Sequence, residues 1–179
     1  MARKICISVI GSGNCDGTLD PEIAGIAGEV GREIAMRGAV LICGGLGGVM
    51  AEAAKGAKEK DGLTIGIIPG EDPCSANPYI DIPIPTGLGF ARNVLVAYSG
   101  DAVIAVSGRL GTLSEISFAL LRNKPVMGIG TWDLNRFEQL KDYGYGMIIC
   151  KNAKEAVEKA FTLISNKTVF SENATQPQV

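Results

Sequence analysis

The chain has 179 residues, enough for one domain with a buried core, and 46% apolar with 20% charged residues is typical of a soluble globular protein. The formal net charge is −2 and no basic block is present, so we expect no nucleic-acid partner. The absence of histidine excludes a Ser-His-Asp triad, a Cys-His dyad and every His-ligated metal site. Because the carboxylates are scattered, we predict no metal site.

The cysteines and the hydropathy pattern indicate in which cellular compartment the protein is found. The five cysteines are odd in number and show no C-x-x-C spacing, which favours buried thiols in a reducing environment. No segment approaches the ~18 apolar residues that a membrane span needs. The apolar run after Met-Ala-Arg-Lys is too short for a secretory signal. We therefore predict a cytoplasmic protein without a membrane partner.

Short apolar runs alternate with helical patterns along the chain. Asp20 and Pro21 are typical of a helix start, as the N-cap and the first helical residue. The alternating, proline-containing run 79–84 favours an edge strand. In chain order, the patterns predict strands over 5–10, 40–43, 63–68, 79–84, 102–106, 125–129 and 147–150, and helices over 21–37, 49–60, 89–98, 112–122, 134–141 and 153–164.

Fully apolar strands separated by helices predict the fold class. They indicate an α/β protein with a mostly parallel sheet and helices on both faces. We therefore expect a single doubly wound, Rossmann-like domain over residues 1–166. The polar tail 167–179 lacks periodicity and is predicted to be disordered. Ligands in such sheets bind beyond the carboxyl ends of the strands, where the Gly-rich turns of this chain lie.

The first turn, which begins at Gly11-Ser12, opens like a dinucleotide fingerprint. It lacks the third glycine, and no acidic residue ends the second strand, so it is weak evidence for NAD. A plain tight connection between strand and helix explains it as well. In the alternative, Gly11, Ser12 and Asn14 line a pocket.

The second turn is the segment Cys43-Gly-Gly-Leu-Gly-Gly-Val-Met50. Four glycines would let the backbone approach a ligand closely, although tight packing of helix on sheet would require the same residue type. The candidate ligand-binding residues here are Gly44, Gly45, Gly47 and Gly48.

The third turn is the strongest motif, Ser107-Gly-Arg-Leu-Gly-Thr-Leu-Ser-Glu115, directly after an apolar strand. Backbone N–H groups and the helix dipole converge there, which favours a phosphate held by Gly108, Gly111 and Thr112. Alternatively, Thr112 caps the helix and Glu115 completes a capping box. A helix N-terminus favours an anion, so we expect Glu115 to be ionised. It could then hold sugar hydroxyls or stabilise an oxocarbenium-like centre but would donate protons poorly.

Two arginines are candidates for the same cleft. Arg92 lies at the start of the helix 89–98 and could clamp a phosphate or pair with Glu115, whereas a solvated surface arginine is the alternative. Arg109 lies within the third turn and either places a cation beside the phosphate or points outward.

These motifs together resemble the Lonely Guy (LOG) family and the related molybdenum cofactor carrier proteins. The family pattern G-G-G-x-x-G-x-M is similar to residues 43–50, with Cys43 at the first glycine. The pattern P-G-G-x-G-T-x-x-E is similar to residues 107–115, except that Ser107 and Arg109 replace the proline and the second glycine. The resemblance covers roughly residues 4–165 and implies a homodimer or larger homo-oligomer.

The resemblance also implies what the site does. In LOG enzymes an arginine and a glutamate, matching Arg92 and Glu115, serve hydrolysis of the N-glycosidic bond of nucleoside 5′-monophosphates, and the Gly-Thr turn binds the phosphate. The two departures from the motif are more similar to the carrier-type branch. A lysine decarboxylase, a label the family once carried, is excluded because nothing supplies a lysine and partners for pyridoxal phosphate.

We therefore predict a binding or carrier protein for a nucleotide-like phosphate ligand, either a nucleoside monophosphate or a molybdenum cofactor-type pterin. Such a protein would require no cofactor beyond the ligand that it carries. A phosphoribohydrolase, which releases free base and ribose 5-phosphate, is the alternative, so the sequence leaves open whether the chain is an enzyme. A third reading is an oligomeric scaffold whose pocket is vestigial.

Overall fold

One parallel sheet of seven strands organises the chain, as seen in the computed structural model, which describes residues 3–13, 19–140 and 146–171. The strand order is β4-β3-β2-β1-β5-β6-β7, and every neighbouring pair is parallel. The strands are β1 (Cys6–Gly11), β2 (Val40–Cys43), β3 (Thr64–Ile68), β4 (Ile82–Pro85), β5 (Ala102–Val106), β6 (Val126–Ile129) and β7 (Met147–Ile149).

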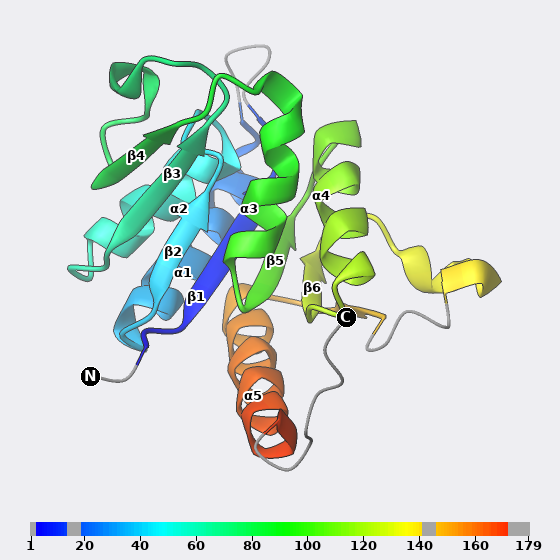
Figure 1. Ribbon diagram of the computed structural model, residues 1–179. Coiled ribbons are helices and arrows are strands. Elements are labelled where there is room, and N and C mark those ends of the chain that lie inside the picture. Colours follow the sequence, from blue (N-terminus) through cyan, green and yellow to red (C-terminus); the bar gives the residue numbers. More distant parts are fainter. Residues whose placement is uncertain (1–2, 14–18, 141–145, 172–179) are drawn as a thin grey trace.

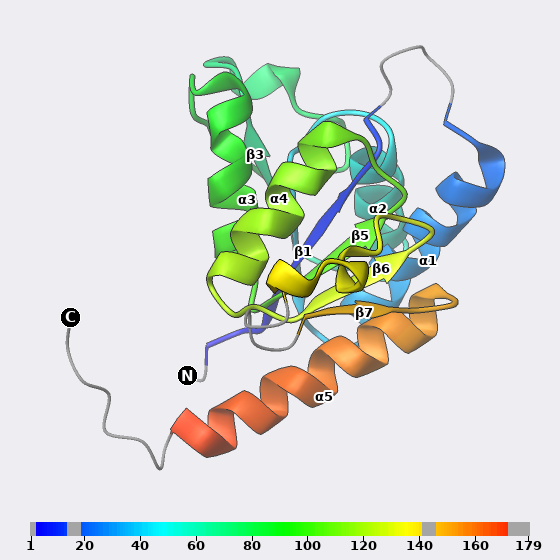
Figure 2. The same ribbon diagram turned by 90° about the vertical axis from the view of Figure 1, so that its right-hand side faces the viewer.

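Helices cover both faces of this sheet (Figures 1 and 2). One core cluster joins the sheet to α1, α2 and α5, and a second joins it to α3 and α4. The predicted doubly wound α/β fold is thereby confirmed. The helices are α1 (Pro21–Met36), α2 (Val49–Lys58), α3 (Asn93–Ser99), α4 (Leu110–Leu121) and α5 (Ala153–Ser171).

The strand order reverses between β1 and β5. The chain winds outward from β1 to β4 and then returns to place β5 on the other side of β1. The register pairs Gly11, the last residue of β1, with Val106, the last residue of β5. The first and third Gly-rich turns therefore leave the sheet side by side, at the edge where doubly wound proteins bind ligands.

Several element boundaries differ from those predicted. The predicted helix 89–98 is a 3₁₀ turn over Gly89–Arg92 followed by α3, and the predicted helix 134–141 consists of two 3₁₀ turns, Leu134–Arg136 and Glu138–Leu140. Residue 141 lies outside the described residues. Helix α5 continues to Ser171 and so includes the first five residues of the predicted tail, while 172–179 lie outside the described residues.

The edge strand begins at Ile82, three residues later than predicted. Asp81 ends the preceding turn, because its carboxylate accepts hydrogen bonds from the backbone N–H and the hydroxyl of Thr64. The N–H of Thr86 points to the Ile68 carbonyl of β3, so alternate positions along β4 point away from β3. Pro83 and Pro85 occupy those positions and remove two donors from the open edge, which protects it against pairing.

Helices α1 and α2 are in backbone contact. A Cβ atom on Gly31 of α1 would lie 1.9 Å from the Ala53 carbonyl oxygen, and one on Gly56 of α2 would lie 2.0 Å from the Gly28 carbonyl oxygen. Only glycine permits this approach. It sets the position of α2 and hence of the Gly-rich turn that precedes α2.

We predict that Gly31→Ala destabilises the protein by at least about 1–3 kcal/mol, because the methyl group forces the two helices apart. Gly25→Ala in the same helix is the matched control. A Cβ there meets nothing within 4 Å, so this variant should be more stable than wild type by about 0.5–1 kcal/mol. Urea unfolding of both variants tests the contrast, and equal effects would contradict it.

Candidate functional site

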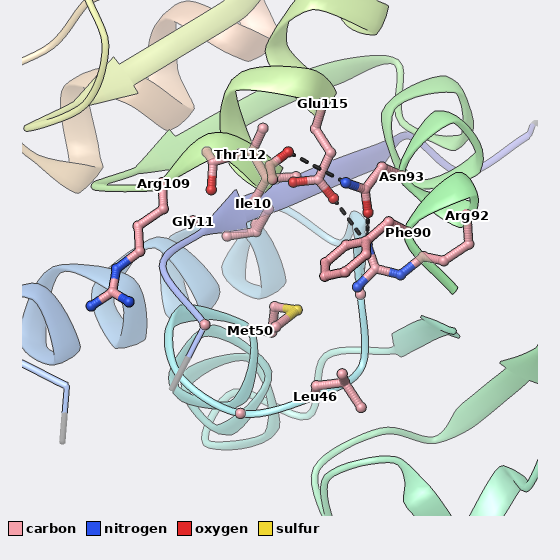
Figure 3. A pocket seen from close by; sticks show the side chains of 15 residues that line it. Ile10, Gly11, Leu46, Met50, Phe90, Arg92, Asn93, Arg109, Thr112 and Glu115 are labelled. Carbon is pink, nitrogen blue, oxygen red and sulfur yellow. Dashed lines mark hydrogen bonds and ion pairs between the residues drawn. The ribbon is translucent and has the colours of Figure 1, made fainter. Parts of the chain in front are cut away.

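A cavity of about 360 Å³ lies at the carboxyl ends of the central strands (Figure 3). Its size falls within the ~300–1,000 Å³ of small-molecule sites. The walls come from the end of β1, the β2–α2 turn, the start of α3 and the start of α4. The lining residues are Val9, Ile10, Gly11, Gly13, Gly44, Leu46, Gly47, Met50, Phe90, Arg92, Asn93, Arg109, Gly111, Thr112 and Glu115.

A buried ion pair forms one wall of this cavity. Arg92 Nη1 lies 3.2 Å from Glu115 Oε1, and the two residues are only 8% and 6% exposed. Arg92 also donates to the side-chain oxygen of Asn93, whose amide nitrogen donates to Ser114 Oγ at 2.9 Å. Arg92 is therefore not a solvated surface arginine. The pair joins the start of α3 to α4 (Figure 3).

Arg92 retains hydrogen-bonding capacity. Its Nε is buried and has no hydrogen-bond partner among the described residues, although buried donors are nearly always satisfied. An acceptor on a bound ligand would satisfy it. Gly44 makes room for this guanidinium, because a Cβ there would lie 2.4 Å from Arg92 Nη2.

The protonation of Glu115 differs from the prediction. Burial raises the pKa of its carboxyl to about 7 and outweighs the opposing effect of Arg92. The expectation of a fully ionised glutamate was wrong for a geometric reason. Helix α4 begins at Leu110, so Glu115 lies beyond the first turn, where the helix dipole has fallen off. Near neutral pH Glu115 can therefore donate a proton.

The capping-box interpretation of Thr112 is also wrong. Arg109 is the N-cap residue of α4 and makes no side-chain cap hydrogen bond, while Thr112 lies buried inside the first turn and lines the cavity. The N–H groups of a first helical turn lack intrahelical acceptors. Gly108 has φ +130°, and a Cβ on it would lie 2.5 Å from Thr112 Cβ, so this glycine allows the turn.

The predicted ligand-binding residues divide into two groups. Those that line the cavity are Gly11, Gly44, Gly47, Arg92, Arg109, Gly111, Thr112 and Glu115; those outside its lining are Ser12, Gly45, Gly48 and Gly108. Figure 3 shows Arg109 pointing away from Glu115. Asn14 lies outside the described residues.

The glycines and serine outside the lining have structural contacts instead. Gly45 has φ +73°, and a Cβ there would lie 2.7 Å from Ile68 Cγ2. Gly48 has φ +70° and precedes α2 as its N-cap residue. The Ser12 hydroxyl lies 3.1 Å from that of Ser107, across the two turns. Positive φ angles at Gly45 and Gly48, with close packing at Gly45, thus explain two of the four glycines in the second turn.

Cys43, which stands at the first glycine of the family pattern, holds this turn internally. Its thiol donates to the Met50 carbonyl and accepts from the Gly45 N–H at 3.3 Å. Burial raises the pKa of the Cys43 thiol to about 11, so the thiol stays neutral. This cysteine is therefore structural.

Sequence reasoning missed six side chains of the lining, which are Val9, Ile10, Leu46, Met50, Phe90 and Asn93. Phe90 lines the cavity yet is 88% exposed, and Leu46 and Met50 form further apolar surface. Asn93 could have been suspected only from its place beside Arg92.

Neither a metal site nor a membrane span is found among the described residues. They contain no group of three or more Cys, Asp and Glu side chains arranged to hold a metal ion. None of the helices in the described part combines the length and apolarity that crossing a membrane requires.

Glu115 should make stability depend on pH. Because the pKa of its carboxyl is about 7 in the folded protein and 4.5 in an unperturbed glutamate, the folded state holds an additional proton between these values. Its stabilising contribution is therefore fully present below about pH 4.5 and falls as the pH rises through about 7, by on the order of 2–3 kcal/mol. Urea unfolding should show wild type losing stability relative to Glu115→Gln over that interval. A constant difference would contradict the raised pKa.

Solved structures share this fold over nearly the whole chain. The molybdenum cofactor binding protein of the phototrophic bacterium Rippkaea orientalis is 37% identical, with a TM-score of 0.82 over 92% of this chain and 99% of that one. The molybdenum cofactor carrier protein of Chlamydomonas reinhardtii is 38% identical, with a TM-score of 0.81 over 91% of this chain and 99% of that one.

Sequence comparison agrees with the structural likeness. An uncharacterized protein of Archaeoglobus fulgidus is 50% identical over 124 residues, which are 69% of this chain and 78% of that protein. The model of the SLOG cluster4 family matches residues 4–157. The resemblance inferred from the Gly-rich motifs is thereby confirmed, and the chain belongs to the SLOG cluster4 family.

Proposed function

We propose that this protein binds a nucleotide-like phosphate ligand as a carrier, with a molybdenum cofactor-type pterin as the first candidate. The observation that carries the proposal is the cavity at the switch point, which combines a helix start with two arginines and an apolar wall. Support comes from the two structures at 37% and 38% identity, whose proteins bind or carry molybdenum cofactor.

The phosphate would lie at the start of α4. There the first turn of α4, Thr112 and Arg109 all line the cavity, so the phosphate could accept from backbone N–H groups, a hydroxyl and a guanidinium. The ring system of the ligand would lie against Phe90 and Met50. The unpartnered Nε of Arg92 would donate to an oxygen or nitrogen of that ring.

One observation favours a phosphoribohydrolase as the second candidate. Glu115 lies in the cavity with a pKa raised to about 7, as a general acid requires. In that reaction Glu115 would give its proton to the departing base while the C–N glycosidic bond breaks. Water would then form the new C–O bond at the sugar and lose a proton, giving free base and ribose 5-phosphate.

Ligand binding can be tested by thermal unfolding with purified molybdenum cofactor and a panel of nucleoside 5′-monophosphates. We expect at least one to raise the melting temperature, because a ligand at ~100 times its Kd adds about 2.7 kcal/mol. Arg109→Gln should weaken this binding by about tenfold through loss of a charged hydrogen bond. Arg136→Gln, at an exposed arginine outside the cavity lining, is the control.

The same mixtures decide between the two candidates when free base and ribose 5-phosphate are assayed. A melting shift without release supports the carrier. Release that disappears in Glu115→Gln would establish the hydrolase instead. Neither a shift nor release would overturn both.

We also propose that the chain forms homo-oligomers through the outer face of α3 and α4. Glu115 is the only charged residue in the two helices, and it is buried. The outer face exposes Leu95, Leu110 and Leu121, with Leu110 75% exposed. The exposed hydroxyls of Ser99 and Ser117 donate back to carbonyls of their own helices. A second copy could cover the apolar part of this face; the nearest charge, the Arg122 guanidinium, lies over the Tyr98 ring where α4 ends.

We expect Leu95→Glu with Leu121→Glu to convert the oligomer to monomer, because each copy would then bury two carboxylates at the contact. Met36→Glu replaces an equally exposed apolar residue on α1, on the opposite face of the sheet, and should leave assembly unchanged. Light scattering after gel filtration gives the masses. A monomeric wild-type protein at micromolar concentration would refute this interface.

A further inference from the structure

A second cavity, of about 270 Å³, lies beside the first at the same edge of the sheet. It is bounded by the ends of β5 and β6 and by the start of α1. Its walls are apolar, from Ile23, Ile26, Val106 and Ile129, and its rim carries the carboxylates of Asp20 and Glu22. None of these residues lines the first cavity.

The strand ends that bound the two cavities lie on opposite sides of the switch point. The first is bounded by β1 and the β2–α2 turn, and the second by β5 and β6. The β5–α4 turn supplies walls to both, since Ser107 lines the second cavity while Arg109 and Gly111 line the first. Dinucleotides in doubly wound folds bind across such a point, one half on each side.

The turn shared by the two cavities suits a phosphate. The shared turn leads into α4, a helix of 12 residues whose first N–H groups favour an anion. Ser107 has φ +54°, a left-handed conformation that is rare for serine, and its hydroxyl meets that of Ser12 between β1 and β5. Arg109 lines the first cavity, two residues after Ser107. Its guanidinium is the cation that a second phosphate would need.

We propose that the site accepts a two-part ligand, in which a phosphate or diphosphate joins a nucleoside or pterin in the first cavity to a nucleoside in the second. This rests on the proposed binding of a phosphate ligand in the first cavity. The apolar walls would hold a flat ring. The carboxylates of Asp20 and Glu22 would accept hydrogen bonds from ribose hydroxyls or ring amino groups.

The charge of the second cavity restricts the chemical class of the ligand's second part. Two carboxylates at its rim disfavour another anionic group, so the second part must be neutral or cationic. Adding a terminal phosphate to a nucleoside monophosphate should therefore increase its affinity little. A second nucleoside should increase the affinity more, because its ring would bury apolar surface of Ile23 and Ile26, which are half-buried in the free protein.

Calorimetric titration with three guanine probes and their adenine counterparts tests this: the monophosphate, the diphosphate and the symmetric P1,P2-dinucleoside diphosphate. For whichever base binds more tightly, the dinucleotide should bind at least about tenfold more tightly than the monophosphate. The diphosphate should show a smaller increase in affinity. A dinucleotide that binds no more tightly than the monophosphate would overturn the two-part ligand while leaving the proposed function intact. No binding by any probe would overturn this inference, and the thermal test with molybdenum cofactor would then decide the proposed function separately.

Two variants test whether the additional affinity of the dinucleotide comes from the second cavity. Ile23→Trp fills it and should abolish the advantage of the dinucleotide while leaving monophosphate affinity unchanged. Ile82→Trp, on the edge strand away from both cavities, is the matched control. Glu22→Gln, at an exposed rim position, should lower dinucleotide affinity severalfold without disturbing the core. A dinucleotide advantage that survives both Ile23→Trp and Glu22→Gln would place the second half elsewhere and refute the assignment.

Discussion

The buried ion pair between Arg92 and Glu115 is the constraint on which the site depends. Removing two charges from water is costly, and well-packed apolar side chains of similar volume would often be at least as stable. This chain instead surrounds the pair with polar support: Asn93 accepts from Arg92, and Gly44 vacates the space for its guanidinium. An arrangement this costly at the wall of a cavity is better explained by ligand chemistry than by stability.

The pair also determines how the cavity responds to charge. Near neutral pH, burial leaves the Glu115 carboxyl beside the Arg92 guanidinium close to half protonated. When Glu115 is neutral, the wall carries a net positive charge, and the start of α4 and Arg109 add to it. Protonation of one carboxylate thus favours an anionic ligand, and a bound anion should in turn favour the protonated form of Glu115.

The sequence contained enough information for the layout but not for the details of packing. Apolar runs and helix caps depend on neighbours in the chain, so the parallel sheet and the turn before α4 were predictable. The role of Gly44 depends on Arg92, 48 positions away, and that of Gly45 depends on Ile68. The pKa of Glu115 depends likewise on burial in the folded protein and on Arg92, 23 positions away. Such contacts across the fold have no signature in local spacing.

The second cavity was likewise not predictable from local sequence patterns. Its apolar walls come from the first turns of α1 and the ends of β5 and β6, residues that read individually as ordinary core positions. Only the strand order brings them together beside the phosphate-binding turn.

Assembly and ligand binding share one structural element. Phe90 lines the first cavity and, at 88% exposure, lies immediately before α3, whose outer face carries no charge. A second copy packed on α3 and α4 would therefore lie close to the mouth of the cavity and restrict the positions open to the ring. Any ordering of Phe90 by a ligand would then alter the surface available to the partner. Since such coupling is reciprocal, occupancy of the cavity and affinity between subunits should change together.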